Sequence, residues 1–220
     1  KNVEQIEYMT SDNKRLVGYR YKAHNGRGEK VKPKGYLLMA LGNAMISDQI
    51  IKYLRPFAQA GYDVYIYDYR GYGNSEGNRR INAFIEDYKE LSVFLNASYD
   101  RSVFYGISLG GVIILNVIGS GIDFDAAVID SSPSRLSNYG CPETIDSVKN
   151  LPSDSSKLMV ITGAKDKVLN ESMTKGLREE AKLKGARTLI GEQFAHPFMD
   201  SREIRKARLK IIMQFLFDRG

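Results

Sequence analysis

The chain has 220 residues, of which 43% are hydrophobic, so it can bury one substantial core, and we expect a single domain over residues 1–220. Its net charge of +6 is modest and scattered, which argues against nucleic acid as a partner. No apolar run approaches the roughly 18 residues of a transmembrane helix, and the single cysteine, Cys141, excludes an internal disulfide.

Segments with strand and helix patterns alternate along the chain. Residues 3–9 and 15–22 predict an antiparallel pair that turns at residues 11–13. The other expected strands are short and apolar: 35–41, 63–69, 102–105, 126–130, 158–162 and 187–190. The expected helices are 48–60, 81–96, 112–118, 173–184 and 201–217. This alternation predicts an α/β fold with a mainly parallel eight-stranded sheet and helices on both faces.

Residues 131–157 separate two of these strands and are rich in Pro, Ser and Asp. Such a segment has room for a short loop or one small helix. We therefore expect little or no lid over the carboxyl edge of the sheet.

The pentapeptide Gly106-Ile107-Ser108-Leu109-Gly110 joins an expected strand to an expected apolar helix. A tight turn in this context is a nucleophile elbow, which presents the serine hydroxyl above the sheet. A second match to the pattern, at Gly73-Asn74-Ser75-Glu76-Gly77, continues into polar residues, so Ser75 is interpreted as a loop residue. Ser108 is the predicted nucleophile of a serine hydrolase.

A serine nucleophile needs a base and an acid that orients it. The chain has two histidines, and only His196 follows the nucleophile, after the last expected strand; His24 precedes it in a polar segment. Asp166, just past the strand at 158–162, is the expected acid, and Asp130, at the end of the preceding strand, is the alternative.

Acyl transfer also needs donors for the developing oxyanion. The amide of Leu109, after the nucleophile, is one expected donor. Asn43, in the loop that follows strand 35–41, is the other, with Ala44 as the alternative. The same loop is also compatible with a simple tight turn.

These segments, together with Asp68-Tyr69-Arg70-Gly71-Tyr72-Gly73, resemble the α/β-hydrolase superfamily, and most closely its compact serine aminopeptidase-like, dipeptidyl-peptidase-like and depalmitoylase-type members. The resemblance covers most of the chain in the right order. It implies that Asp68 and Arg70 are ion-paired scaffolding. Leu41 replaces a histidine that is common in the oxyanion loop of relatives, so the support of this loop must differ.

We expect hydrolysis of a carboxylic ester or thioester through an acyl-enzyme on Ser108, with a small acyl ester, thioester or acylated peptide as substrate. A serine peptidase, or a non-catalytic binding protein of the same fold, is the alternative. No metal or organic cofactor is expected, because the Cys and His spacing offers no zinc site and the glycine-rich stretches lack a phosphate-loop lysine.

A basic cluster lies on the last expected helix, at Arg202, Arg205, Lys206, Arg208 and Lys210. We expect a solvated helix face, with attraction to an anionic membrane or nucleic acid as the alternative. The sequence begins at Lys1 rather than methionine, and any signal peptide or lipid anchor is expected upstream of it. The localisation and the oligomeric state therefore stay open.

Overall fold

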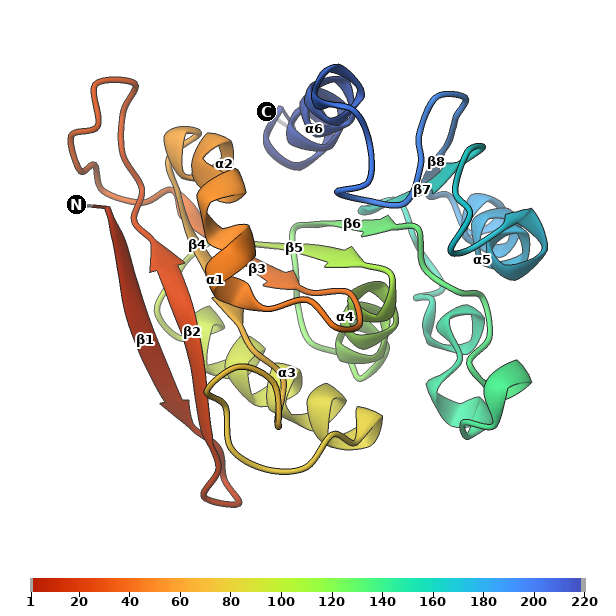
Figure 1. Cartoon of the computed structure of the whole chain (residues 1–220), viewed down its shortest axis with the longest axis horizontal. Helices are drawn as coiled ribbons and strands as arrows, with labels where there is room; N and C mark the ends of the chain where they lie inside the picture. The colour runs from red at the N-terminus through yellow and green to blue at the C-terminus, as the bar shows by residue number, and fades with distance from the viewer. Residues whose placement is uncertain (1, 219–220) are drawn as a thin grey trace.

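The computed structural model describes residues 2–218 and has one eight-stranded sheet, whose strands lie in the order β1-β2-β4-β3-β5-β6-β7-β8 (Figure 1). The strands are β1 (Val3–Met9), β2 (Arg15–Tyr21), β3 (Gly35–Ala40), β4 (Tyr62–Tyr67), β5 (Ser102–Ile107), β6 (Ala126–Asp130), β7 (Leu158–Gly163) and β8 (Arg187–Gly191). β1 and β2 form the expected antiparallel hairpin. The other six strands, β4, β3, β5, β6, β7 and β8 in sheet order, run parallel to one another. The predicted fold class is confirmed.

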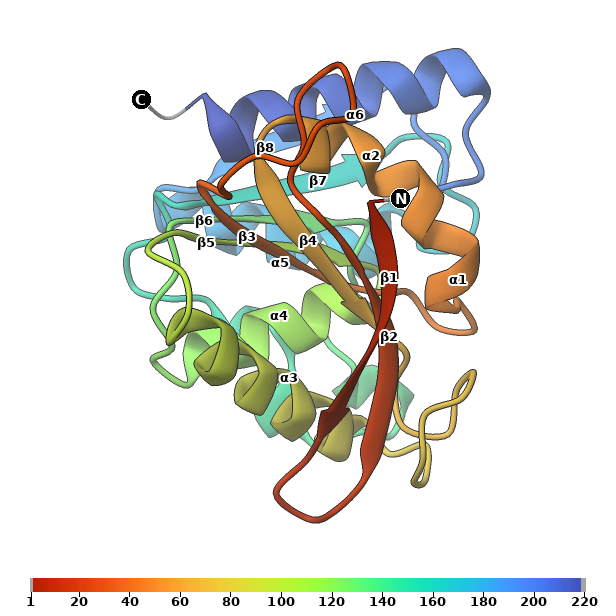
Figure 2. The same ribbon diagram turned by 90° about the vertical axis from the view of Figure 1, so that its left-hand side faces the viewer.

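Helices cover both faces of the sheet. They are α1 (Ser47–Ile50), α2 (Arg55–Gln59), α3 (Ile81–Asn96), α4 (Leu109–Gly119), α5 (Glu171–Leu183) and α6 (Arg202–Phe217). α1, α2 and α6 lie on one face, and α3, α4 and α5 lie on the other (Figures 1 and 2). Because helices cover both sides, the central strands are buried along their whole length, as their continuous apolar runs predict.

The helix expected over residues 48–60 is divided into three short pieces. α1 is followed by a 3₁₀ turn at Ile51–Leu54 and then by α2. Pro56 stands at the second position of α2, where its missing N–H costs no intrahelical hydrogen bond. One continuous helix would have needed that hydrogen bond, which explains the restart.

Residues 131–157 contain three short 3₁₀ helices, Ser137–Tyr139, Glu143–Ile145 and Ser147–Asn150, where a short loop or one small helix was expected. The last of them packs against α4 and α5, on the lower face of the sheet in Figure 1. The absence of a large lid agrees with the expectation.

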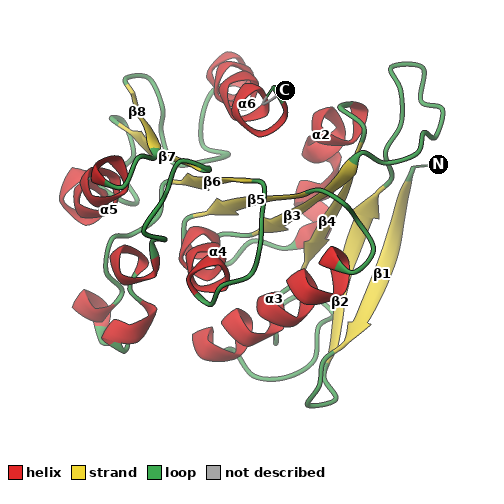
Figure 3. Ribbon diagram, turned by 180° about the vertical axis from the view of Figure 1, so that it is seen from behind, coloured by secondary structure: helices red, strands yellow, loops and turns green. Residues whose placement is uncertain are grey.

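α4 lies under the centre of the sheet, beneath β5 and beside α3 (Figure 3). Its residues from Gly110 to Ile118 are all buried, so the helix is covered around its whole circumference. This burial fixes the helix that follows the elbow. Within residues 2–218, no helix combines the length and the apolar character that a bilayer span requires.

Candidate active site

The chain passes directly from β5 into α4, with Ser108 as the single residue between them. Ser108 has φ 53° and ψ −116°, a positive φ that a residue with a side chain adopts only under strain. The flanking glycines are required here, because a Cβ on Gly106 would lie 2.6 Å from the carbonyl oxygen of Gly110. A Cβ on Gly110 would lie 2.0 Å from the carbonyl oxygen of Ala40. The geometry is that of the elbow expected from the sequence.

Besides the bond from the amide of Gly111 to its carbonyl (3.0 Å), the backbone of Ser108 is held by two residues at and after the end of β6. Its amide donates to the carbonyl of Asp130 (2.9 Å), and the hydroxyl of Ser132 donates to its carbonyl (2.8 Å). The Ser108 hydroxyl itself forms no hydrogen bond with any residue in the described range 2–218, and the residue is partly exposed. The side chain is therefore positioned by its backbone and left without a polar partner.

Asp166 and His196 form a hydrogen-bonded pair. Oδ2 of Asp166, in the loop after β7, lies 2.8 Å from Nδ1 of His196, in the loop after β8. Oδ1 of Asp166 accepts the amides of Val168 (2.8 Å) and Leu169 (2.9 Å). Both partners are largely buried, with side-chain exposures of 1% for Asp166 and 11% for His196.

These contacts determine the charge of Asp166. Burial by itself raises the pKa of this carboxyl, but the hydrogen bonds from His196 and from the two amides outweigh it and hold the pKa below its usual range. An ionised Asp166 can accept a hydrogen bond from the N–H at Nδ1 of His196, which leaves Nε2 free to accept a proton. The strands before Ser108, Asp166 and His196 are parallel, so all three residues lie at the carboxyl edge of the sheet.

Asp130, the alternative acid, contacts other groups. Its carboxylate accepts from Arg208 (2.9 Å), Tyr105 (3.1 Å) and Ser131 (3.3 Å) and is fully buried. The structure therefore brings Asp166, and not Asp130, to His196.

Arg208 is a residue of this region whose role the sequence did not reveal. Its guanidinium donates to Asp130 on one side, and to Asp200 (2.7 Å) and the carbonyl of Ala195 (2.9 Å) on the other. Asp200 also accepts the amide of Ala195 (2.7 Å). Arg208 thus ties both ends of the loop that carries His196 to the end of β6.

The expectation of a solvated face was wrong for Arg208, which is only 3% exposed. Arg208, Ile212 and Phe215 are spaced by four and three residues and are all buried, so they share the inner face of α6. This spacing is visible in the sequence and could have identified Arg208 as a buried residue.

We expect Arg208→Met to lower the free energy of unfolding by about 3–5 kcal/mol, because two buried carboxylates, Asp130 and Asp200, lose their cation. Arg178→Met is the matched control. Arg178 pairs with Glu171, whose side chain is 57% exposed and can be solvated, so the loss should be about 1 kcal/mol. Urea unfolding measures both variants. Equal losses would contradict the role given to the buried pairs.

The loop after β3 lies against the elbow. A Cβ on Gly42 would be 3.6 Å from Cβ of Ser108. The amide of Met45 bonds the carbonyl of Gly42 (3.4 Å), so the loop does form a tight turn, and Ala44 within it has φ 59°. The amide of Asn43 has no hydrogen-bond acceptor within residues 2–218. The amide of Leu109 is the first of α4, and an amide at the start of a helix has no acceptor within that helix.

Side chains in the segment after β4, rather than a histidine at position 41, support the loop after β3. The hydroxyl of Tyr69 donates to the carbonyl of Leu41 (2.6 Å), and that of Tyr72 donates to Oδ1 of Asn43 (2.7 Å). The carboxylate of Asp68 accepts the amide of Ser47 (2.6 Å). The loop is therefore held from both of its ends.

Arg70 supports the fold rather than the site. Its guanidinium bonds Asp87 through Nε (2.7 Å) and Asp12 through Nη1 (2.6 Å), which links the β1–β2 hairpin to α3. This agrees with the scaffolding role that the resemblance implies, but the ion-pair partners of Arg70 are Asp12 and Asp87 and not Asp68.

The two alternative residues lie in structural contacts. Ser75 is buried, accepts the amide of Val17 (2.9 Å) and donates to the carbonyl of Asp68 (2.8 Å). His24 is buried just past the end of β2, which runs antiparallel to β4, so it lies at the sheet edge opposite Ser108. Its Nδ1 lies 3.0 Å from the carbonyl of Lys22. Ser75 lies past the end of β4, at the same edge of the sheet as Ser108, but its hydroxyl is engaged by backbone groups; His24 lies at the opposite edge.

No group of three or more His, Cys, Asp or Glu side chains within residues 2–218 is arranged to hold a metal ion.

The fold is shared with solved esterase structures. The chain superposes on the Pyrococcus furiosus esterase Pf2001 with a TM-score of 0.73 and 19% identity, over 97% of this chain and 91% of that one. It superposes on the esterase domain of a Rhodothermus marinus protein with a TM-score of 0.72 and 17% identity, over 96% and 98% of the two chains.

Curated sequence relatives match a smaller part of the chain. The chain is 26% identical to the uncharacterized protein YfhR of Escherichia coli K12 over 60% of its own length and 48% of that protein. It is 31% identical to the polyketide transferase claH of Penicillium crustosum over 52% of its own length and 39% of that protein. The chain thus spans about half the length of the curated relatives that it matches.

The family model described as serine aminopeptidase, S33, matches residues 31–143, a segment that includes the loop after β3, the elbow and the end of β6. This match covers just over half of the chain and agrees with the eight-stranded sheet and the elbow geometry. The chain therefore belongs to the serine aminopeptidase S33 family of the α/β-hydrolase superfamily.

Proposed function

We propose that the chain is a serine hydrolase that cleaves carboxylic esters or thioesters through an acyl-enzyme on Ser108. One observation carries the proposal: a strained elbow serine stands at the same edge of the sheet as a hydrogen-bonded Asp166–His196 pair. Nucleophile, acid and base follow one another along the chain in the order typical of this fold. We further propose that residues 1–220 act as one domain, since a single sheet carries all of these groups.

In the proposed reaction, Oγ of Ser108 attacks the carbonyl carbon while Nε2 of His196 takes the hydroxyl proton. The tetrahedral intermediate collapses, the bond to the leaving group breaks, and His196 gives the proton to the departing alcohol or thiol. Water then attacks the acyl-enzyme by the same route, which releases a carboxylic acid and restores Ser108.

Asp166 orients the imidazole and stabilises its cationic form without itself becoming protonated. Its lowered pKa supports this role, since the carboxylate persists to a lower pH than a free aspartate. The Ser108 hydroxyl has no hydrogen bond in the free protein, and such contacts often tighten only when the substrate binds.

The amides of Leu109 and Asn43 are the proposed donors to the oxyanion. Both are backbone groups, so the replacement of a histidine by Leu41 does not remove a donor. The contact between Gly42 and Ser108 supports a position for this loop beside the developing charge.

An ester or thioester is preferred to a free peptide as substrate. The neighbours of similar fold are esterases by name. A small acyl ester, a thioester or an acylated peptide is therefore the proposed substrate class.

Labelling with a fluorophosphonate probe tests the proposal. The probe should form one adduct, and peptide mapping should place it on Ser108. Hydrolysis of p-nitrophenyl esters and of matched acyl thioesters should be lost in proportion to the labelled fraction. An adduct on Ser75, or a folded protein that neither labels nor hydrolyses any ester, would reject the assignment and favour a non-catalytic protein.

A further inference from the structure

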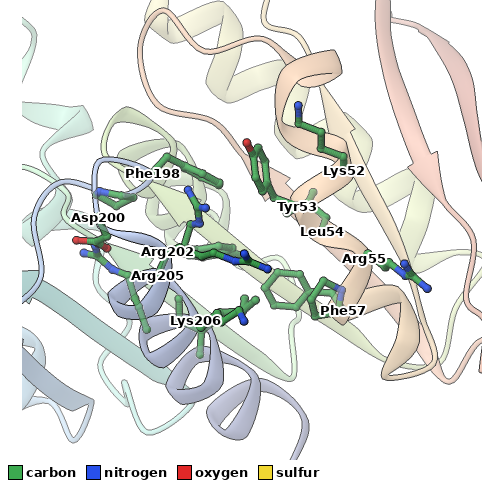
Figure 4. Close-up of a pocket in the computed structure, with 16 residues that line it drawn as sticks. Lys52, Tyr53, Leu54, Arg55, Phe57, Phe198, Asp200, Arg202, Arg205 and Lys206 are labelled. Atoms are coloured by element: carbon green, nitrogen blue, oxygen red, sulfur yellow. The ribbon is translucent and has the colours of Figure 1, made fainter. Parts of the chain in front are cut away.

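A cavity of about 560 Å³ lies between the helical segment at residues 52–57 and α6, on the face of the sheet that α1 and α2 share with α6 (Figure 4). Its floor is apolar. It is formed by Phe57, Tyr105, Leu209 and Ile212, of which Phe57 and Ile212 are 1% exposed. A volume of this size is typical of small-molecule sites.

Five cationic side chains surround this apolar floor: Lys52, Arg55, Arg202, Arg205 and Lys206. Figure 4 shows the first two on the α1–α2 segment and the other three on α6. None of the five forms an ion pair or a side-chain hydrogen bond with another residue in the range 2–218; the guanidinium of Arg205 lies over the ring of Tyr53 (5.1 Å). Like charges on one cavity wall repel one another, so an anion near them would be stabilised.

The acidic residues nearby do not neutralise this rim. Asp200 is the one carboxylate among the lining residues, and it is already bound by Arg208 and by the amide of Ala195. Glu203, in the first turn of α6, does not line the cavity. The amino-terminal end of α6, at Arg202, adds the positive end of a helix of 16 residues.

The wall of the cavity also contains an unpaired buried donor. Arg208 lines the cavity and is 3% exposed, and its Nε has no hydrogen-bond partner among the described residues. A buried N–H without an acceptor is destabilising unless a ligand or water satisfies it.

The cavity adjoins the loop that carries His196. Pro197 and Phe198, the next two residues, both line it. Phe198 has φ 68°, a strained conformation for a bulky residue, and its ring packs against that of Tyr53 at 5.6 Å between centroids. Strain of this kind is typical of functional sites.

We propose that this cavity binds an amphiphilic anion, that is, a small molecule with an alkyl chain and one phosphate or carboxylate head. The chain lies on the floor of Phe57, Leu209 and Ile212, and the head lies among the cations of the rim. A dissolved single molecule is the occupant, because a concave apolar floor with charged residues around it fits one chain better than a flat membrane. The proposal concerns binding alone and does not depend on the reaction at Ser108.

Calorimetry with decyl phosphate below its critical micelle concentration tests the proposal. Decyl phosphate should bind the wild-type protein with one-to-one stoichiometry, and hexyl phosphate should bind at least tenfold more weakly because it buries fewer methylenes. Decyltrimethylammonium, with the same chain and the opposite charge, should not bind. The proposal would be overturned if decyl phosphate and decyltrimethylammonium bound with equal affinity, or if decyl phosphate bound no more tightly than hexyl phosphate.

Charge-reversal variants locate the site. Lys206→Glu, at an exposed side chain without a partner in the described range, and Arg205→Glu should each weaken decyl phosphate binding by tenfold or more. Lys182→Glu makes the same charge change at an exposed position on α5 and should leave the affinity within twofold. Equal effects of all three would indicate attraction by net charge only and would overturn the proposal.

Two further measurements separate this site from the proposed reaction and from lipid surfaces. The Ser108→Ala protein should bind decyl phosphate as the wild type does, whether or not Ser108 is the nucleophile. The protein could instead bind vesicles of anionic phospholipid and not the dissolved amphiphile. That result would identify a membrane as the ligand and overturn the inference.

Discussion

Ser108→Ala should lower kcat/KM for a soluble ester by about 10⁴-fold or more, since the remaining donors and base cannot form an acyl-enzyme. The free energy of unfolding should change by no more than about 0.5 kcal/mol, because the hydroxyl makes no hydrogen bond that the substitution would break. Alanine keeps the Cβ, and the backbone contacts to Asp130 and Ser132 do not involve the lost oxygen. Initial rates and urea unfolding measure the two effects.

Ser75→Ala is the control with the opposite expectation. Ser75 accepts the amide of Val17 in a buried position, so its loss should cost about 1–3 kcal/mol of stability. The folded fraction should still hydrolyse ester at the wild-type rate and should still take up the fluorophosphonate probe. If Ser75→Ala were inactive while folded, or if Ser108→Ala retained activity, the nucleophile would have to be reassigned.

The regular parts of the fold were predictable because they depend on local pattern. Eight apolar or alternating segments predicted eight strands, and the pair of glycines around Ser108 predicted the elbow. The division of the helix over residues 48–60 was missed because the apolar spacing continues through Pro56. Periodicity reports which face is buried and does not report where the backbone hydrogen bonds are interrupted.

The pairing of charged groups was harder to predict, because it depends on strand order. Asp130 and Asp166 both follow strands that end at the same edge, and the sequence alone ranked them without excluding either. Which of the two carboxylates pairs with His196 depends on α6. Arg208 of this helix binds Asp130, and Asp166 binds His196. A contact between residues 78 positions apart has no local signature.

His196→Ala should reduce kcat/KM about as much as Ser108→Ala, because nucleophile and base act as a unit and the loss of either stops proton transfer. The double variant Ser108→Ala/His196→Ala should therefore lose little more than either single variant. If the two residues acted independently, the fold-losses in kcat/KM of the single variants would multiply in the double variant. A double variant that is several orders of magnitude less active than both single variants would therefore contradict a shared role.

His24→Ala is the matched control for His196→Ala. His24 is 2% exposed, stacks on Tyr21 with ring centroids 5.3 Å apart and bonds the carbonyl of Lys22, so its removal should lower the melting temperature. It lies at the edge of the sheet opposite Ser108, and kcat/KM below the melting transition should stay within about twofold of wild type, because His24 touches none of the proposed catalytic groups. Rates measured for both variants at a temperature where each is folded separate the two histidines. Loss of activity in folded His24→Ala, with His196→Ala still active, would show that the wrong histidine has been assigned as the base.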